Sequence, residues 1–118
     1  MSTTYQPTCT LQTAQARAAM YATLRQFFAE RQVLEVQTPV MSQAGNTDIF
    51  LQSVSSNVTV GDNPTTYYLH TSPEFVLKRI LVAWQVPLYQ FCLVFRTTAI
   101  GIRNNIEFNL IDWYLPNF

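Results

Sequence analysis

The chain has 118 residues, of which 48% are apolar and only 12% are charged. The apolar content excludes an intrinsically disordered tail, and the length fits one small domain. Seven basic side chains balance seven acidic ones, whereas a protein held to nucleic acid by phosphate contacts needs a basic surplus. With so little charge on a small domain, we expect some apolar surface that a partner covers.

The sequence carries no signal for a membrane or for secretion. No apolar run reaches the roughly 20 residues that span a bilayer, and residues 1–10 lack the basic start and apolar core of a signal peptide. We therefore expect a cytoplasmic protein with no membrane partner. Cys9 and Cys92 fit a reducing compartment, although a disulfide between them is possible. A single histidine and no CxxC motif predict no metal ligands.

The N-terminal third is predicted to be a leader followed by one helix. Residues 1–10 are expected to be a flexible leader, and 11–118 to form the folded domain. Residues 11–32 contain no Gly or Pro, so they predict a helix whose start Thr10 or Thr13 can cap. Bulky residues at spacings of three and four predict that the C-terminal half of this helix is packed.

A series of short strands should follow the helix. The β-branched segment 33–38 predicts a strand that stops at Pro39. Turn-forming residues then predict turns at 42–48 and 61–64. The predicted strands around these turns cover residues 49–54, 57–60 and 65–70.

The second half of the chain begins with a strong helix start. Ser72 can cap the helix, Pro73 fits its first turn, and Glu74 faces the positive end of the helix dipole. The helix should run to about Trp84 and end before Pro87.

A long hairpin should complete the domain. Residues 88–96 are apolar nearly throughout and predict a strand buried on both faces. Residues 97–106 predict a loop, and 107–114 a return strand. Strands outnumber helices and consecutive ones can pair antiparallel, so the predicted class is α+β.

Three stretches have a recognisable order and spacing. They are FFAERQVLEVQTPVMSQ at 27–43, LHTSPEFVLKRILVA at 69–83, and VFR at 94–96 with EFNLIDWY at 107–114. Together they resemble motifs 1 and 2 of the class II lysyl-tRNA synthetase family. The resemblance is closest to the short paralogues of that family that attach lysine to elongation factor P. It covers nearly the whole chain from about residue 12.

Two features favour the paralogues over the tRNA synthetases. The synthetases carry an anticodon-binding barrel before the first helix, where this chain has only residues 1–10, and the chain lacks the basic excess that tRNA demands. The resemblance implies an antiparallel sheet flanked by helices, and a homodimer formed through motif 1. It also implies ATP and Mg²⁺ as cofactors and elongation factor P as a partner. We do not expect tRNA to be a partner.

The resemblance assigns the nucleotide site to three residues. Activating a carboxylic acid with ATP places growing charge on the α-phosphate, and Arg96 at a strand end offers a fork that suits phosphate oxygens. Phe108 matches the aromatic on which the family stacks adenine, and Asn105 matches a nucleotide-contacting position. The alternatives are an Arg96–Glu107 pair, core packing of Phe108 and a plain turn for Asn105.

The resemblance assigns the amino-acid site to the helix start and the last strand. Ser72, Pro73 and Glu74 match residues that hold the substrate, with Glu74 on its α-ammonium group. Tyr114 matches the tyrosine that meets the distal amino group of lysine. Asp112 stands where the family has Glu, which keeps the charge and shortens the reach. The alternatives are helix capping for Ser72 and Glu74, and an exposed strand-end side chain for Tyr114.

The sequence also departs from the family pattern. The family follows its motif 2 Arg with Asn-Glu-Glu, and this chain has TTA at 97–99. Ile102 and Asn104 replace the Arg and His of the loop, although Arg103 lies next to them. Trp84 stands at a position where the family has a small Gly.

Residues 1–118 do not include a counterpart of the family's third motif. Two hypotheses therefore stand. The first is an ATP-dependent aminoacyl ligase that forms an adenylate. The second is a truncated or degenerate noncatalytic remnant, at most a dimerising or weak nucleotide-binding module. An N-terminal piece of a lysyl-tRNA synthetase is a third, less favoured alternative because the barrel is missing.

Overall fold

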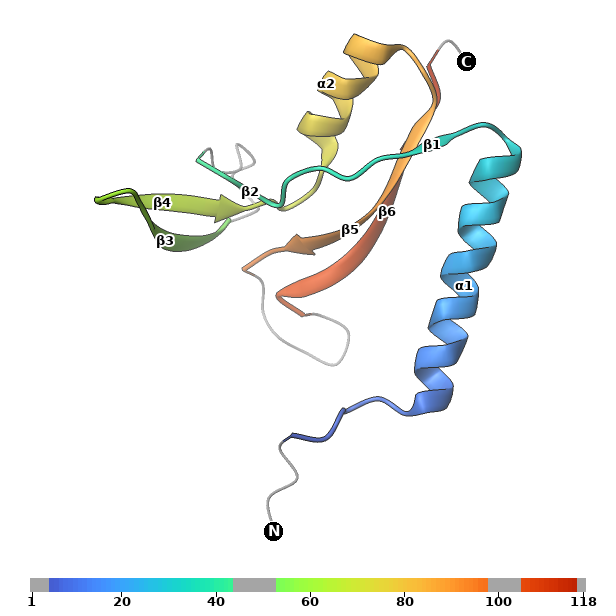
Figure 1. Cartoon of the computed structure of the whole chain (residues 1–118), viewed down its shortest axis with the longest axis horizontal. Coiled ribbons are helices and arrows are strands. Elements are labelled where there is room, and N and C mark those ends of the chain that lie inside the picture. Colours follow the sequence, from blue (N-terminus) through green and yellow to red (C-terminus); the bar gives the residue numbers. More distant parts are fainter. Residues whose placement is uncertain (1–4, 44–52, 98–104, 117–118) are drawn as a thin grey trace. The chain divides into compact units, whose positions relative to one another are not determined.

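A computed structural model describes residues 5–43, 53–97 and 105–116 (Figure 1). These residues form two helices and six strands, so the α+β class predicted from the sequence is confirmed. Contacts separate the chain into two compact units, residues 1–33 and 34–118. No helix within the described ranges is both long and apolar enough to cross a membrane.

The first unit consists of an N-terminal segment and helix α1 (Leu11–Glu30). The side chain of Thr10 accepts a hydrogen bond from the Thr13 amide at 3.1 Å, so Thr10 is the cap that the sequence left open between two threonines. The helix ends two residues earlier than predicted, because Gln32 adopts a left-handed conformation with φ of 58°. In its C-terminal half Phe28 is buried, while Phe27 is 46% exposed. Fewer bulky side chains of the C-terminal half of α1 are therefore buried than the sequence predicts.

The second unit contains a three-stranded mixed sheet in the order β1-β5-β6. These strands are β1 (Leu34–Glu35), β5 (Leu88–Phe95) and β6 (Glu107–Tyr114). Strands β5 and β6 form the predicted antiparallel hairpin, and β6 has the predicted bounds. Strand β1 runs parallel to β5, which corrects the expectation of antiparallel pairing alone. The parallel pair is feasible because the long connection between β1 and β5 includes a helix.

Strand β5 is less completely buried than predicted. Leu88 and Val94 are fully buried, but Leu93 is 41% exposed, so burial on both faces holds only for the first part of the strand. Toward its end the strand alternates between a covered face and an open one.

A second sheet has the order β2-β4-β3 and comprises β2 (Met41–Ser42), β3 (Val54–Val60) and β4 (Asn63–Leu69). The hairpin between β3 and β4 turns at Gly61, whose φ is 62°. Two corrections follow. The predicted break between 54 and 57 is absent, because Ser55 and Ser56 pair with Tyr68 and Tyr67. Pro64 lies at the start of β4 and not in the turn. Most of the predicted 42–48 turn lies outside the described residues, as do residues 98–104 of the predicted 97–106 loop.

Helix α2 (Glu74–Trp84) has the bounds expected from the sequence. The Glu74 amide donates to Ser72 Oγ at 3.3 Å, and Gln85 ends the helix with φ of 55°. Its Leu77 is fully buried, together with Leu88 and Val94 of β5. Figure 1 shows α2 directly before β5 in the chain, with β6 beside β5. The segment before α2 is held to the end of β5, because the Phe95 amide donates to the His70 carbonyl at 3.0 Å.

Candidate functional site

One face of the β5–β6 hairpin carries several of the residues singled out by the sequence. Directly opposed residues of an antiparallel pair project to the same face. Phe108 is opposite Val94, Asp112 is opposite Gln90, and Tyr114 is opposite Leu88. Because side chains alternate along a strand, these residues share one face. The predicted nucleotide residue therefore lies at one end of this face, and the predicted amino-acid residues lie toward the other.

Arg96 follows the last residue of β5 and is held by two neighbours. Its Nε donates to the Thr71 carbonyl at 3.2 Å, and its guanidinium carbon lies 5.1 Å from the centre of the Phe108 ring. These contacts, and not the alternative pair with Glu107, orient the guanidinium. Because the Thr71 bond uses Nε, the side-on mode of binding an oxyanion is blocked, and the end-on mode through the two terminal nitrogens is left for a two-point contact.

The start of α2 brings a carboxylate to the same region. Ser72 accepts from the Glu74 amide, which supports the capping alternative for Ser72, and Pro73 is fully buried. Glu74 Oε1 lies 2.7 Å from Lys78 Nζ, one helical turn further along. Both side chains are about half exposed, at 48% and 54%. Glu74 is thus accessible to a ligand, and a cation already faces it.

Asp112 and Tyr114 are linked to each other and to Glu74. The Tyr114 hydroxyl donates to Asp112 Oδ2 at 3.4 Å. Burial raises the pKa of Asp112, and hydrogen bonds from the Trp113 backbone and the Tyr114 side chain partly offset this. The charge of Glu74 raises the pKa further, and the charge of Lys78 lowers it slightly. Burial, together with the charges of Asp112 and Glu74, raises the pKa of Tyr114 to about 12. Tyr114 is half-buried and not the exposed strand-end residue of the alternative interpretation.

The predicted residues are therefore gathered unequally. Arg96 and Phe108 are in contact. The charge of Glu74 shifts the pKa values of Asp112 and Tyr114. Asn105 is exposed in the segment before β6, and its contact with a nucleotide stays a prediction.

Two sets of polar contacts on or beside this face lie outside the predicted site residues. Thr38 Oγ1 donates to Gln90 Oε1 at 3.0 Å, and both residues are buried. His70 Nε2 lies 3.0 Å from Cys92 Sγ and 2.7 Å from the Leu93 carbonyl oxygen. Burial, with a smaller effect of the Asp112 charge, raises the pKa of the Cys92 thiol to about 11. A lone Gln inside an apolar strand was the available signal for the first contact.

Comparison with known proteins identifies the family. Residues 6–118 match the class II tRNA synthetases (D, K and N), and the chain belongs to that family. The resemblance inferred from the three stretches is thereby confirmed.

Individual relatives narrow the similarity within the family. The chain is 40% identical over 116 residues to the elongation factor P–(R)-β-lysine ligase of Mannheimia succiniciproducens, 41% over 116 residues to that of Haemophilus influenzae strain PittGG, and 42% over 121 residues to that of Photobacterium profundum. These alignments cover 97%, 97% and 100% of this chain. The chain spans only 36–37% of the length of these relatives.

Proposed function

We propose that this chain forms part of the active site of an ATP-dependent aminoacyl ligase of the kind its relatives are named for. In this proposal an amino acid is activated as its adenylate and then passed to a lysine of elongation factor P. The observation that carries the proposal is the arrangement on the hairpin face. A cation on an aromatic ring, Arg96 on Phe108, lies on the face that also carries Asp112 and Tyr114, with Glu74 close to these two.

The two ends of the face suit the two halves of an adenylate. Arg96 would neutralise the charge that grows on the α-phosphate as the amino-acid carboxylate attacks it, and a fixed cation there stabilises the transition state. Phe108 would offer its ring to adenine. Glu74 and Asp112 would each face one ammonium group of a diamino acid, and Tyr114 would add a hydroxyl donor or acceptor beside the distal one.

We assign the Mg²⁺ that accompanies ATP to none of the residues named above. ATP normally carries Mg²⁺ on its phosphates, and hard oxygen ligands would be needed to fix it. Within the described ranges no group of three or more His, Cys, Asp or Glu side chains is placed to hold a metal ion. The residues of this face therefore act on the substrate directly in our proposal.

A second candidate is a noncatalytic dimerising or weak nucleotide-binding module. Two departures from the family pattern favour it: uncharged Thr98 stands where the lysyl-tRNA synthetase family has an acidic residue, and Ile102 stands where that family has Arg. Dimerisation in either case would use motif 1, which covers α1 and the segment that follows it.

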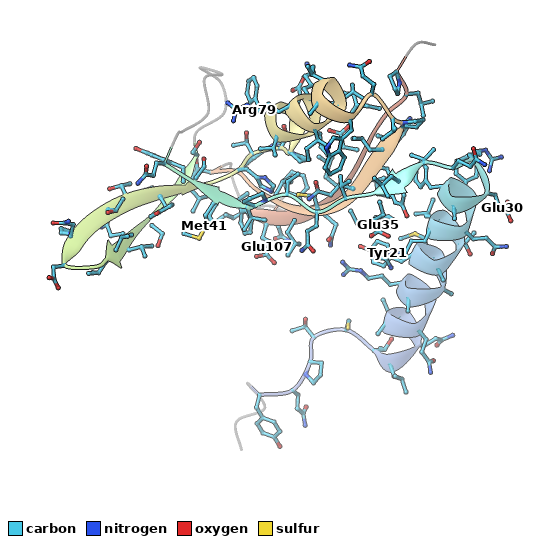
Figure 2. The ribbon with its side chains drawn as sticks, turned by 45° about the horizontal axis from the view of Figure 1, so that its top comes forward. Tyr21, Glu30, Glu35, Met41, Arg79 and Glu107 are labelled. Carbon is cyan, nitrogen blue, oxygen red and sulfur yellow. The ribbon has the colours of Figure 1, made fainter. Side chains whose placement is uncertain are left out.

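The experiment that tests the proposed site uses crossed variants of the 118-residue chain. AMP and L-lysine are titrated separately while backbone amide shifts are recorded. Arg96→Ala should weaken AMP binding and spare lysine, whereas Glu74→Gln should weaken lysine binding and spare AMP. Arg79→Ala, which removes an exposed arginine of α2 (Figure 2), is the charge-matched control for Arg96. Absence of saturable shifts with both ligands would contradict the proposed function.

A further inference from the structure

Glu74 already has a cationic partner in the structure. Lys78 Nζ lies 2.7 Å from Glu74 Oε1, which is hydrogen-bonding distance for two charged groups. The two residues are four apart on α2, the spacing that places side chains on the same side of a helix. The group that faces Glu74 is therefore a primary ammonium, chemically the same group that an amino-acid substrate would present.

The charges of the Glu74–Lys78 pair also act on the hairpin. Glu74 raises the pKa of Asp112, whereas Lys78 has a smaller, lowering effect. Glu74 also raises the pKa of Tyr114. The direct contact of Lys78 is with Glu74, so Lys78 bears on the proposed amino-acid site through that carboxylate.

We propose that Lys78 is a displaceable internal counter-ion that occupies the ammonium position at Glu74 until an amino acid with an α-ammonium group replaces it. This inference rests on the proposed function and assigns a specificity-determining role to a residue outside the predicted site. The exchange is balanced in charge, because one ammonium leaves Glu74 as another arrives. Lys78 is then released to solvent.

The side chains present suit such an exchange. Both are about half exposed, so the pair is weak and reversible and displacing Lys78 opens no buried unpaired charge. Lysine is a compact point charge on a flexible stem, whereas an arginine would hold the carboxylate through a two-point fork. Lys78 is the single lysine of the chain, which has arginine at its other six basic positions.

The test compares two ligands that differ in one group. L-lysine carries an α-ammonium, whereas 6-aminohexanoate has the same carboxylate and distal ammonium but lacks it. We expect Lys78→Met to bind L-lysine about twofold more tightly than the wild type, the factor that corresponds to one exposed ion pair at this spacing. Its affinity for 6-aminohexanoate should not change. Affinities are measured by titrating backbone amide shifts of the full 118-residue chain.

Control variants separate this effect from general electrostatics. Arg79→Met removes the same charge from the neighbouring position of α2 and should leave both affinities unchanged. Lys78→Gln should repeat the effect of Lys78→Met, so the result does not depend on one replacement. Both positions are exposed, and the amide spectrum verifies that each variant is folded.

The possible outcomes decide between the two levels of the hypothesis. If Glu74→Gln weakens lysine binding but Lys78→Met does not strengthen it, the inference is wrong and the proposed site stands. Equal effects of Lys78→Met and Arg79→Met, or an equal gain for 6-aminohexanoate, would also overturn the inference. If lysine does not bind the wild type at all, the proposed amino-acid site is wrong and the inference with it.

Discussion

At the scale of single residues, the orientation of Arg96 depends on neighbours from two other segments. The Thr71 carbonyl accepts from Nε, and the guanidinium carbon lies 5.1 Å from the centre of the Phe108 ring. An arginine restrained in this way loses less side-chain freedom when it binds an anion than a free one does. A nucleotide site on this face would therefore be centred on the phosphate nearest the adenosine.

The first prediction concerns which part of a nucleotide contributes to binding. In the proposed site Arg96 would contact the α-phosphate and Phe108 the base, so AMP and ATP–Mg²⁺ should bind with similar affinity. One arginine contact and one aromatic stack contribute little net binding free energy, because the loss of translational and rotational entropy on association offsets most of it. We expect a dissociation constant in the millimolar range or weaker, about −4 kcal/mol. Titration followed by Trp113 fluorescence or amide shifts measures it, and ATP binding a hundredfold tighter than AMP would reveal a further phosphate site.

The second prediction concerns the pH dependence of stability at Asp112. Its pKa is raised in the folded chain, mainly by burial. A raised folded pKa means that this group favours folding when protonated and that the contribution is lost as pH rises through the folded pKa. Asp112→Asn should therefore increase the free energy of unfolding at pH 7, by at most about 1 kcal/mol because the group is partly exposed.

Urea denaturation at two pH values measures this effect. The gain at pH 7 should vanish below about pH 3, where the carboxyl is protonated in both states. Asp62→Asn, at an exposed turn position, is the matched control and should change stability little at either pH. A loss of stability in Asp112→Asn at pH 7 would show that the carboxylate stabilises the fold.

At the scale of elements, α2 is both a scaffold and a part of the site. Its buried side presents Leu77 to the interior, while Glu74 in its first turn and Lys78 one turn later form an exposed ion pair. The helix start is fixed locally by Ser72 and Pro73, and its placement depends on burial of Leu77. Packing of one leucine therefore controls where the proposed amino-acid ligand would bind.

The third prediction tests this dependence. Leu77→Ala removes a fully buried side chain, and such a change leaves a cavity that costs about 2–5 kcal/mol. Val82→Ala on the same helix is the control, because Val82 is 72% exposed and its truncation should cost less than about 0.5 kcal/mol. Chemical denaturation measures both. Equal losses for the two variants would mean that α2 is not anchored through Leu77.

At the scale of the whole molecule, low charge and exposed apolar side chains point to association. Met20 and Phe27 of α1 are 51% and 46% exposed, and Leu34 of β1 is 47% exposed. Only 12% of all residues are charged. The homodimer implied by the resemblance to motif 1 would cover such side chains.

The fourth prediction is self-association through α1 and residues 33–39. Sedimentation at micromolar concentration should show a dimer or a larger species. Phe27→Asp is the informative variant, because Phe28 is itself buried and its replacement would disturb the fold. Phe27→Asp should shift the population toward monomer, whereas Phe75→Asp, at an exposed position of α2, should not. A wild-type monomer whose state Phe27→Asp leaves unchanged would refute this prediction.

The fifth prediction concerns catalysis by the 118-residue polypeptide. These residues span 36–37% of the length of the relatives, and each absent charged contact to phosphate can cost several kcal/mol of transition-state stabilisation. We expect no ATP–pyrophosphate exchange above background with lysine or β-lysine and Mg²⁺. Exchange that Arg96→Ala abolishes would show that the polypeptide suffices for adenylate formation.

The sequence by itself determined the elements whose signals are local. The Ser72-Pro73-Glu74 sequence predicted the start of α2 and Pro87 predicted its end, and residues 107–114 after the predicted loop gave β6, because caps, prolines and loop signals act within a few residues. The family followed from three stretches, covering motifs 1 and 2, in a fixed order and spacing. Within the predicted strand 107–114, side-chain alternation also places Phe108, Asp112 and Tyr114 on one face.

The tertiary structure alone decided the contacts between distant segments. It selected the parallel pairing of β1 with β5, the Thr71 carbonyl as the partner of Arg96, and the electrostatic coupling of Glu74 to Asp112. A local pattern does not specify these contacts, because each depends on which segments meet after the chain has closed long loops. The proposed role of Lys78 also depends on the tertiary structure. The sequence shows that Lys78 is four residues from Glu74, but it does not show that the charges of both residues act on Asp112.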